Sequence, residues 1–388
     1  MKSKFLLALA ALLPGFSQAI NLDDSGSLTL TGFYSLTAGK VLSGTAQGSS
    51  TPWTYQNWKC PCMMQNWEYT GVYQKEKGWQ LDQESLLGVQ IKKEFSPNFS
   101  FTTQLVTRAL NPNRGSKPTI DWAYFSWNPW PEQPITIQAG RFRIPLYYYS
   151  DYLYIGYAYP WVRPAPDVYG WPIYAYDGVN IGYKTQLGKS DWSLAAQLWY
   201  GGFTQRNNAY DTLIYYTTPT HEKWKQITGG WVTLNNGVLE LRAMLMKHRA
   251  TVWQEDASGA KTYLLNNQFT RIAGLAANLD YNNWIVKSEF DRFEQINPEA
   301  GIRNIYKYAL LGVGYNYGNW TPMFTMSRYT TVTEPIEARS SKYFSLRWDF
   351  RKDTALKIQY DITKDKSHYP YPFFGDARML SVSLQGVF

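Results

Sequence analysis

Cysteine and histidine are scarce in this chain of 388 residues, which contains two cysteines and three histidines. Two cysteines are too few to hold together a disulfide-rich fold. His221, His248 and His368 lie in none of the Gly-x-Ser-x-Gly, His-Glu-x-x-His or Cys-x-x-Cys motifs that position nucleophiles, metals or redox pairs. We therefore expect no enzyme activity and no cofactor.

Charge and long apolar runs are also limited. Charged residues make up 18% of the chain, the mean hydropathy is −0.40, and the longest apolar run is Phe5–Leu13. A membrane-spanning helix needs about 20 apolar residues, so a bundle of membrane helices is excluded. Aromatic residues reach 17%, which argues against a disordered chain. A soluble protein and a transmembrane β-barrel remain, since such a barrel combines aromatic girdles with a polar lumen.

The first residues have the features of a secretory signal peptide. Two lysines precede the apolar stretch Phe5–Leu13, and small residues occupy the −3 and −1 positions of a cleavage site after Ala19. We expect residues 1–19 to be a signal peptide and residues 20–388 to form one β-barrel domain. Removal of the two lysines lowers the formal net charge from +8 to +6.

Alternation of apolar and polar residues recurs along the rest of the chain. In the final segment, Met379–Phe388, Leu380, Val382 and Leu384 alternate with polar residues, which indicates a strand with one apolar face. Similar alternation places charged residues such as Lys357 in the middle of expected strands. In a barrel the apolar face meets lipid and the charged face lines water, so this pattern favours the barrel over a soluble sandwich.

Turn residues divide the pattern into strands and connections. Short connections such as Ser96–Asn98 and Asn282–Asn283 contain residues that form tight turns. They alternate with longer connections near 42–80, 144–176 and 202–223, which predicts short periplasmic turns and long external loops. Strands are expected to begin near residues 27, 82, 99, 118, 135, 177, 191, 224, 238, 267, 284, 303, 320, 339, 354 and 377.

The sequence therefore predicts an all-β fold, a transmembrane antiparallel β-barrel of about 16 strands. The segments near 118, 303 and 320 alternate less regularly, so barrels of about 14 or 18 strands are the alternatives. A barrel of about 16 strands encloses an aqueous channel rather than a core filled by side chains.

The chain resembles the Gram-negative general porins, the 16-stranded outer-membrane diffusion channels. Residues 27–34 are similar to their opening strand, 121–127 and 135–143 to their fourth and fifth strands, and 176–183 to the strand after their third loop. The resemblance implies that a constriction loop, about 144–176, folds into the barrel. It also implies a homotrimer in outer-membrane lipid, with Arg141 and Arg143 at the narrowest level of the pore.

The expected constriction loop differs from the usual porin pattern because it is rich in Tyr, Trp and Pro and carries few charges. Those charges are Asp151, Arg163 and Asp167. Its aromatic rings could stack on sugar rings or other flat solutes in the pore. Alternatively, they pack the loop against the barrel wall as buried rings do.

The polar strand faces carry a set of cations that we expect to line the pore. A ring of Arg or Lys raises the local concentration of anions and lowers their barrier to passage, so we expect a mild anion preference. Acidic residues such as Glu240 and Glu289 share these faces, and salt bridges are the alternative role for many of the cations. The expected pore-lining cations of the strands are Arg108, Lys184, Arg242, Lys287, Arg347 and Lys357.

The long first loop contains the sequence Cys60-Pro-Cys62-Met63-Met64. Thiolates and thioethers suit soft metals such as Cu(I), so these four sulfur-containing side chains are weak candidates for a metal site. The alternative is a disulfide between Cys60 and Cys62 in an exposed loop.

The function that this reading predicts is passive diffusion of small hydrophilic solutes and ions through an outer-membrane porin. The alternatives are a substrate-specific channel for an anion or a sugar, and a structural barrel plugged by its own loops. Although the chain is basic, no basic stripe accompanies a nucleic-acid-binding motif, so we expect no nucleic-acid partner.

Overall fold

The computed structural model describes residues 19–45, 53–55, 58–109, 118–216, 218–297, 301–368, 371 and 373–388. The expected signal peptide, residues 1–19, lies outside this range except for Ala19. Among the described residues, no helix is long and apolar enough to cross a membrane.

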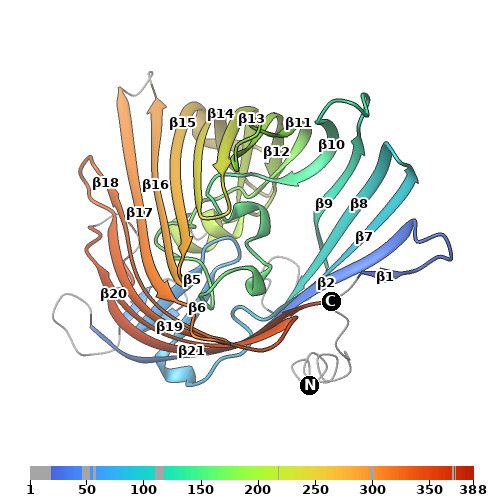
Figure 1. Ribbon diagram of the computed structural model, residues 1–388. Coiled ribbons are helices and arrows are strands. Elements are labelled where there is room, and N and C mark those ends of the chain that lie inside the picture. Colours follow the sequence, from blue (N-terminus) through green and yellow to red (C-terminus); the bar gives the residue numbers. More distant parts are fainter. Residues whose placement is uncertain are drawn as a thin grey trace.

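Sixteen long strands of the described chain form one closed antiparallel sheet, a β-barrel (Figure 1). The expected strand number is confirmed. The strands are β2 Leu28–Thr45, β7 Leu86–Ser96, β8 Phe99–Arg108, β9 Thr119–Trp127, β10 Ile135–Arg143, β11 Ala175–Gln186, β12 Ser193–Gln205, β13 Thr220–Asn235, β14 Leu239–Glu255, β15 Lys261–Tyr281, β16 Trp284–Asn297, β17 Ile302–Tyr315, β18 Trp320–Thr331, β19 Ala338–Arg351, β20 Thr354–Asp365 and β21 Asp376–Val387.

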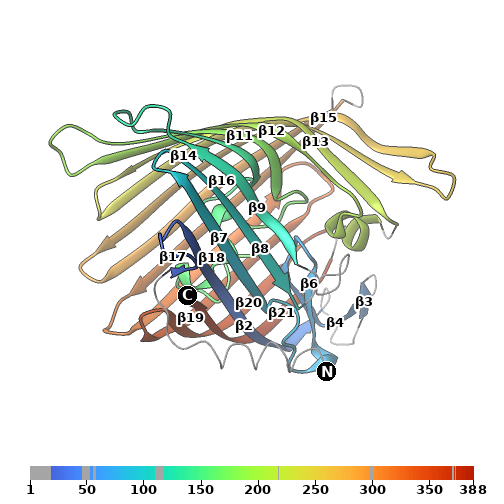
Figure 2. The same ribbon diagram turned by 90° about the vertical axis from the view of Figure 1, so that its right-hand side faces the viewer.

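Short connections and long ones lie at opposite ends of the barrel, as the turn residues predict. Turns such as 97–98, 282–283 and 352–353 join strands at one end, which we call the short-turn end, whereas the segments 46–85 and 144–174 begin at the long-loop end. The strands run obliquely around the barrel (Figure 2).

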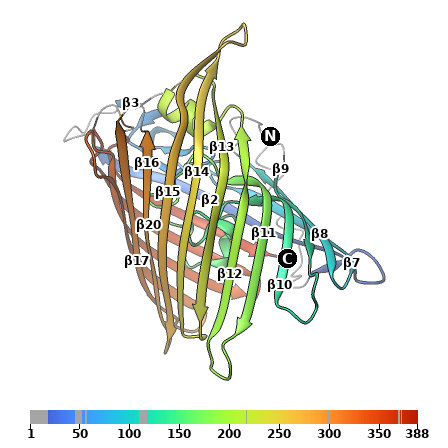
Figure 3. The same cartoon turned by 90° about the horizontal axis from the view of Figure 1, so that it is seen from above.

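The largest error in the expected strand starts lies at β15, which begins at Lys261 instead of 267. The β14–β15 hairpin continues beyond its neighbours at the long-loop end (Figure 3). The part of this hairpin nearest its turn is rich in polar residues, so the alternation of apolar residues did not reveal where β15 begins. Its backbone ladder nevertheless extends to the pair Glu255 and Lys261.

The barrel closes where the last strand pairs with the first long one. Strand β21 pairs with β2 from Phe33 opposite Val387 to Thr45 opposite Asp376. Gly32 and Phe388 exchange two backbone hydrogen bonds of 2.7 and 2.9 Å, so the final residue takes part in the closure. Closure pairs the first and last long strands, so that their backbone N–H and C=O groups do not form an open sheet edge in the bilayer.

The outer face of the wall is apolar, with aromatic residues toward the short-turn end. Leu245 and Leu275 are 68% and 62% exposed on this face. Trp284 packs on Tyr315 and Trp320 stacks on Trp348, each pair beside a short turn. Exposed apolar side chains on a closed barrel are explained by contact with lipid, and rings at strand ends suit the headgroup level.

Segments of the loop before β7 and of the loop after β10 lie inside the barrel, between the walls that Figure 1 shows. The loop before β7 forms the hairpins β3 Trp53–Tyr55 with β4 Trp58–Cys60 and β5 Cys62–Asn66 with β6 Gly71–Gln74, then the short helix η1 Lys75–Lys77. The loop after β10 contains η2 Ser150–Tyr152 and η3 Gly156–Ala158, and the loop after β12 contains η4 Asp211–Tyr216. A two-residue strand, β1 Ile20–Asn21, pairs with β2.

The barrel seam predicts the effect of a single added methyl group. A Cβ at Gly32 would lie 2.2 Å from Cζ of the Phe388 ring, so the ring must move. Gly32→Ala should lower the free energy of unfolding by about 1–3 kcal/mol, measured by urea unfolding in detergent. Gly182→Ala is the matched control, because its Cβ would meet only the carbonyl oxygen of Thr136, at 3.9 Å. Equal stability of the two variants would contradict this role of the seam.

Candidate functional site

Residues 144–174, which we call the inner loop, pack against the opposite wall of the barrel. The ring of Tyr147 stacks on Phe293 with centroids 5.4 Å apart, and Trp171 meets the same ring edge-on at 4.8 Å. The Trp161 indole donates a hydrogen bond of 2.7 Å to Oγ1 of Thr325. The loop therefore crosses the lumen and contacts strands far from its own ends.

The rings of the inner loop are mostly buried rather than presented to the lumen. Tyr147 is 2% exposed and Trp161 is 1% exposed. Tyr149 lies among five other rings, with centroids 4.7 to 6.0 Å from its own. This packing supports the structural role of the aromatic residues, because rings enclosed on all sides cannot stack on a passing solute.

Lys357 anchors the inner loop instead of standing free in the pore. Its Nζ, from β20, donates hydrogen bonds to the carbonyl oxygens of Gly156, Tyr159 and Trp161 at 2.6, 2.5 and 2.9 Å. The side chain is fully buried. A buried ammonium is stabilised only where its three N–H groups find acceptors, and this one finds three.

Two further expected pore cations also hold the inner loop. Arg163, within the loop, forms ion pairs with Glu84 at 2.5 Å and Asp361 at 3.3 Å. Arg347, on β19, pairs with Asp349 at 2.7 Å and donates to the carbonyl of Tyr157 at 2.7 Å. Arg163 and Arg347 therefore form salt bridges, the alternative role considered for the expected pore cations.

The two acidic residues of the inner loop are also enclosed. Burial raises the pKa of Asp151, although Arg242 and Arg143 act in the opposite direction. Burial likewise raises the pKa of Asp167, whose carboxylate accepts a hydrogen bond of 2.6 Å from Ser327. Both carboxyl groups therefore bind a proton more readily than free aspartate does.

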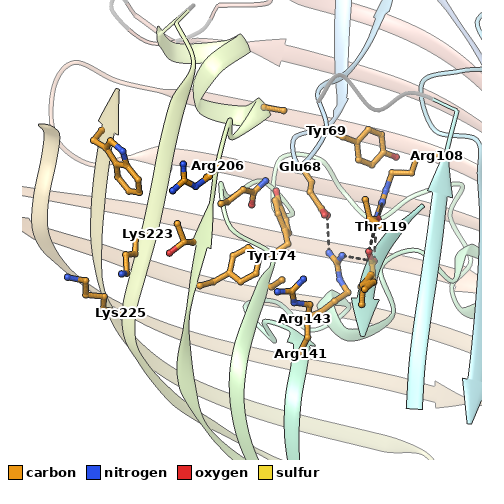
Figure 4. A pocket seen from close by; sticks show the side chains of 18 of the residues that line it. Glu68, Tyr69, Arg108, Thr119, Arg141, Arg143, Tyr174, Arg206, Lys223 and Lys225 are labelled. Carbon is orange, nitrogen blue, oxygen red and sulfur yellow. Dashed lines mark hydrogen bonds and ion pairs between the residues drawn. The ribbon is translucent and has the colours of Figure 1, made fainter. Parts of the chain in front are cut away.

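A cavity of about 970 Å³ at the long-loop end is the candidate functional site (Figure 4). We call it the basic cavity because seven cations and two carboxylates line it. It lies where the ladder between β9 and β10 ends. In this ladder, residues Ala123–Trp127 of β9 pair with Ile137–Arg141 of β10, and the strands part beyond Ala123 and Arg141. Its cations are Arg108, Arg141, Arg143, Arg206, Lys223, Lys225 and Lys261.

Two of the cations form a buried ion network at the inner side of the cavity. Arg143 pairs with Glu68 at 3.1 Å and with Asp121 at 3.2 Å, and Asp121 also pairs with Arg108 at 3.4 Å. Tyr154 donates a hydrogen bond to Glu68. Burial alone would raise the pKa of Glu68, but Arg143 and Arg108 outweigh it and lower the pKa. Glu68 is thus ionised, and this part of the cavity is nearly neutral.

The cations on the opposite side of the cavity keep more of their charge. In the part of the chain that the structure describes, Arg206, Lys223 and Lys225 have no carboxylate within 4.0 Å. Lys261 pairs weakly with Glu255 at 3.7 Å. Figure 4 shows Arg206, Lys223 and Lys225 across the cavity from Glu68 and Arg108. Lys223 and Lys225 flank the buried Trp224 and therefore point to the outer face of β13, which places their positive charge on the outward-facing side of the cavity.

Arg141 lies away from the narrow level that the porin resemblance implied. It pairs with Asp177 at 2.7 Å on the face of β11 that carries the exposed Val179 and Ile181. The physical reason is the two-residue alternation of β10, in which Phe142 faces inward, so that Arg141 faces outward. Arg143 turns inward because the chain leaves the sheet there and enters the inner loop.

The other expected cations remain more accessible. Lys184 is exposed near the short-turn end, and Lys287 is half-buried. Arg242 is half-buried, lies 4.7 Å from the centre of the Trp231 ring and donates to the carbonyl of Tyr148 at 3.3 Å. These three residues are available to influence the lumen below the inner loop.

Six charged lining residues of the basic cavity were not named by the sequence analysis: Glu68, Asp121, Arg206, Lys223, Lys225 and Lys261. Glu68 and Arg206 lie in the expected loops 42–80 and 202–223, where no alternation of residues indicates which way a side chain points. Lys223 was also assigned to a loop, because β13 starts four residues earlier than expected. The alternation Lys223-Trp-Lys225 was the one local signal that could have placed both lysines on one face.

The cysteines of the first loop are joined to each other by a disulfide. Met63 and Met64 are buried beside them, and Met63 Sδ accepts a hydrogen bond of 2.8 Å from Gln65. In this form neither cysteine supplies a thiolate to a metal. The disulfide alternative is therefore right about the bond and wrong about the exposed position, because Cys60 and Cys62 are 1% and 0% exposed and pack among apolar side chains of the first loop.

The geometry is that of the outer-membrane porin fold, a closed 16-stranded barrel with a loop folded inside. One similar solved structure is the DcaP channel of Acinetobacter baumannii, with 10% sequence identity, a TM-score of 0.60 and coverage of 97% of this chain and 100% of that chain. Another is OmpF of Salmonella typhi in complex with daunomycin, with 11% identity, a TM-score of 0.58 and coverage of 96% of this chain and 100% of that chain. The anion-selective porin of Comamonas acidovorans is also similar, with 14% identity, a TM-score of 0.57 and coverage of 93% of this chain and 99% of that chain. No family model and no curated protein sequence matches this chain.

The anchoring of the inner loop by Lys357 leads to a prediction. Lys357→Met leaves three buried carbonyls without their donor, which costs about 1–3 kcal/mol. The inner loop should therefore detach more often, and chymotrypsin should cleave residues 144–174 faster in the folded protein. Lys364→Met, at an exposed position of the same strand, is the control. Equal cleavage rates in the two variants would show that Lys357 does not hold the loop.

Proposed function

We propose that this protein is an outer-membrane channel through which small hydrophilic solutes and ions diffuse passively, with a mild preference for anions. The observation that carries the anion preference is the basic cavity, where Arg206, Lys223 and Lys225 stand without a carboxylate partner among the described residues. Lys223 and Lys225 lie on the outer face of β13, since their partners Thr251 and Arg249 share the face of Lys247, and their charge acts on anions near the long-loop end over about 8 Å at physiological ionic strength.

The barrel wall supports the channel part of this proposal. Its outer face is apolar, its inner face combines polar side chains with the apolar ones that pack against the inner loop, and sixteen strands enclose more space than wall side chains alone fill. We also propose that residues 1–19 are removed as a signal peptide during export, since an outer-membrane protein must first cross the inner membrane.

A substrate-specific anion channel is the second candidate. The inner loop and the loop bearing Glu68 both enter the barrel, and Lys357, Arg163 and Arg347 hold the inner loop by charge-assisted hydrogen bonds. A loop fixed inside the barrel narrows the space left for solutes, which favours selected solutes over general diffusion, and the basic cavity favours anions among them. Saturable block of the current by one anion would support this candidate, and complete absence of conductance would support a plugged structural barrel.

Ion selectivity in planar bilayers tests the role of the basic cavity. Under a KCl gradient, the wild-type reversal potential should have the sign of an anion-preferring channel. Arg206→Gln/Lys223→Gln/Lys225→Gln should shift that potential toward cation preference, because it removes the three unpaired charges. The shift should be larger at low salt than at high salt, where screening is stronger.

The matched control for the selectivity measurement is Lys342→Gln, which removes an exposed cation from β19, away from the cavity. This control should keep the wild-type potential. A cation-preferring wild-type channel would refute the anion preference without refuting the channel.

A homotrimer is the assembly that we propose. This proposal rests on the porin resemblance, and OmpT of Vibrio cholerae, which has 9% identity and a TM-score of 0.54, is described in a trimer form. Native mass spectrometry in detergent should give three times the mass of residues 20–388, and conductance should change in groups of three equal steps. A monomeric mass with single steps would contradict the trimer.

A further inference from the structure

The outer face of β12 to β17 carries a groove that the channel function does not use. Its volume is about 770 Å³. Part of its floor follows one row of the sheet, in which Leu198, Gly230, Leu245 and Ala273 are successive cross-strand partners. Gly230 and Ala273 have little or no side chain, whereas Leu198 and Leu245 are 63% and 68% exposed. Gly230 lies between the two leucines, where Leu198 Cδ2 leans over it, and Ala273 lies beyond Leu245, so that these small residues leave an apolar depression beside Leu245.

Cations border this depression on the side of the long loops. The residues Lys247, Arg271, Arg292 and Arg303 line the groove. Lys247 is the cross-strand partner of Arg271, and Ala273 is the partner of Arg292. Arg292 therefore continues the apolar row, Lys247 and Arg271 lie two residues from it along their strands, and Arg303 lies four residues from it on β17.

One carboxylate organises the border of the groove. Glu294 is 3% exposed although it lies on the outer face. It pairs with Arg271 at 2.5 Å and with Arg303, and Arg292 lies 3.9 Å away. These three arginines keep side-chain exposures of 51% to 57%. One buried negative charge thus orders three exposed guanidinium groups and leaves a clear excess of positive charge.

The cations lie at the level where lipid headgroups should be. Arg271 and Tyr281 share the outer face of β15 and are ten residues apart, and Tyr281 belongs to the aromatic residues of the short-turn end. Ten residues span about 34 Å of strand, or about 26 Å across a membrane for a tilt of about 40°. That height matches the apolar band of such barrels, about 25 Å. Arg271 therefore lies at the opposite interface.

Charge complementarity selects the occupant of the groove. A second copy of this chain would have to supply carboxylates on its own outer face, where lipid-facing residues are mainly apolar. A lipid with a phosphate headgroup offers both parts at once, since its acyl chain is apolar and its phosphate forms bidentate hydrogen bonds with arginine. Basic residues near a membrane surface attract such headgroups.

We propose that the groove binds a phosphate-bearing lipid of the leaflet at the long-loop end. An acyl chain lies along Gly230 and Ala273, and Lys247, Arg271 and Arg292 contact the phosphate. This site rests on the proposed membrane location but not on conduction of solutes.

Native mass spectrometry with two matched lipids tests the site. The lipids are dioleoyl phosphatidic acid and dioleoylglycerol, which differ only in the phosphate, each added to full-length mature protein in neutral detergent. The wild-type protein should bind phosphatidic acid much more tightly than dioleoylglycerol. Lys247→Gln/Arg292→Gln should weaken phosphatidic acid binding about thirtyfold, because it removes two cations. This variant leaves Glu294 paired with Arg271 and Arg303.

A second variant and a control separate the apolar part of the site from the basic part. Ala273→Leu fills the depression, so binding of both lipids should weaken. Lys364→Gln removes an exposed cation of β20, outside the groove, and should leave both affinities unchanged.

Three results would overturn the proposal. The first is equal affinity of the wild-type protein for the two lipids. The second is an equal effect of Lys364→Gln and of Lys247→Gln/Arg292→Gln on phosphatidic acid binding. The third is that Lys247→Gln/Arg292→Gln dissociates an oligomer and leaves lipid binding unchanged. The last result would assign the groove to a second copy. Conductance of the same samples keeps the two proposals apart, since Lys247→Gln/Arg292→Gln should conduct as the wild type does.

Discussion

The need to pair every backbone N–H and C=O group at the sheet edges is the constraint on which the rest of this structure depends. Strand β21 satisfies it by pairing with β2, and the hydrogen bonds of Phe388 with Gly32 complete the seam. Once the sheet is closed, its two faces have different surroundings. The outer face must be apolar at membrane depth, and the inner face encloses a space wide enough to receive the inner loop.

Buried charge then decides how that space is filled. Lys357 and Arg163 hold the inner loop through carbonyl and carboxylate oxygens, and Arg143 ties its beginning to Glu68 and Asp121. Such charges stabilise a fold only when they are paired, because the cost of desolvating an unpaired ion is large. Among the described residues, Arg206, Lys223 and Lys225 at the basic cavity have no carboxylate within 4.0 Å, and the outer groove holds more cations than its one carboxylate, Glu294, can neutralise. Positive charge therefore anchors the inner loop, and we propose that it also attracts anions and contacts lipid.

Most of the barrel could be predicted from the sequence. The tight turn at Asn282–Asn283 and the alternation along Leu356–Ile362 are local properties, since side chains of a strand alternate between faces and certain residues favour turns. The candidate site could be predicted only in part. Arg108 and Arg143 were named as pore-lining cations, yet both are buried in ion pairs with Asp121. The partners of Lys357 are about 200 residues away in the sequence, and no pattern within a strand identifies them.

The sequence by itself determined an all-β chain, its strands, its turns and the two faces of each strand, because these depend on neighbours within a few residues. Only the tertiary structure decided which cations are neutralised and which remain available. Ion pairing depends on distances of a few ångströms between segments remote in the chain, such as Arg163 and Asp361. The basic cavity and the outer groove therefore emerge only when the sheet has closed and its loops have entered it.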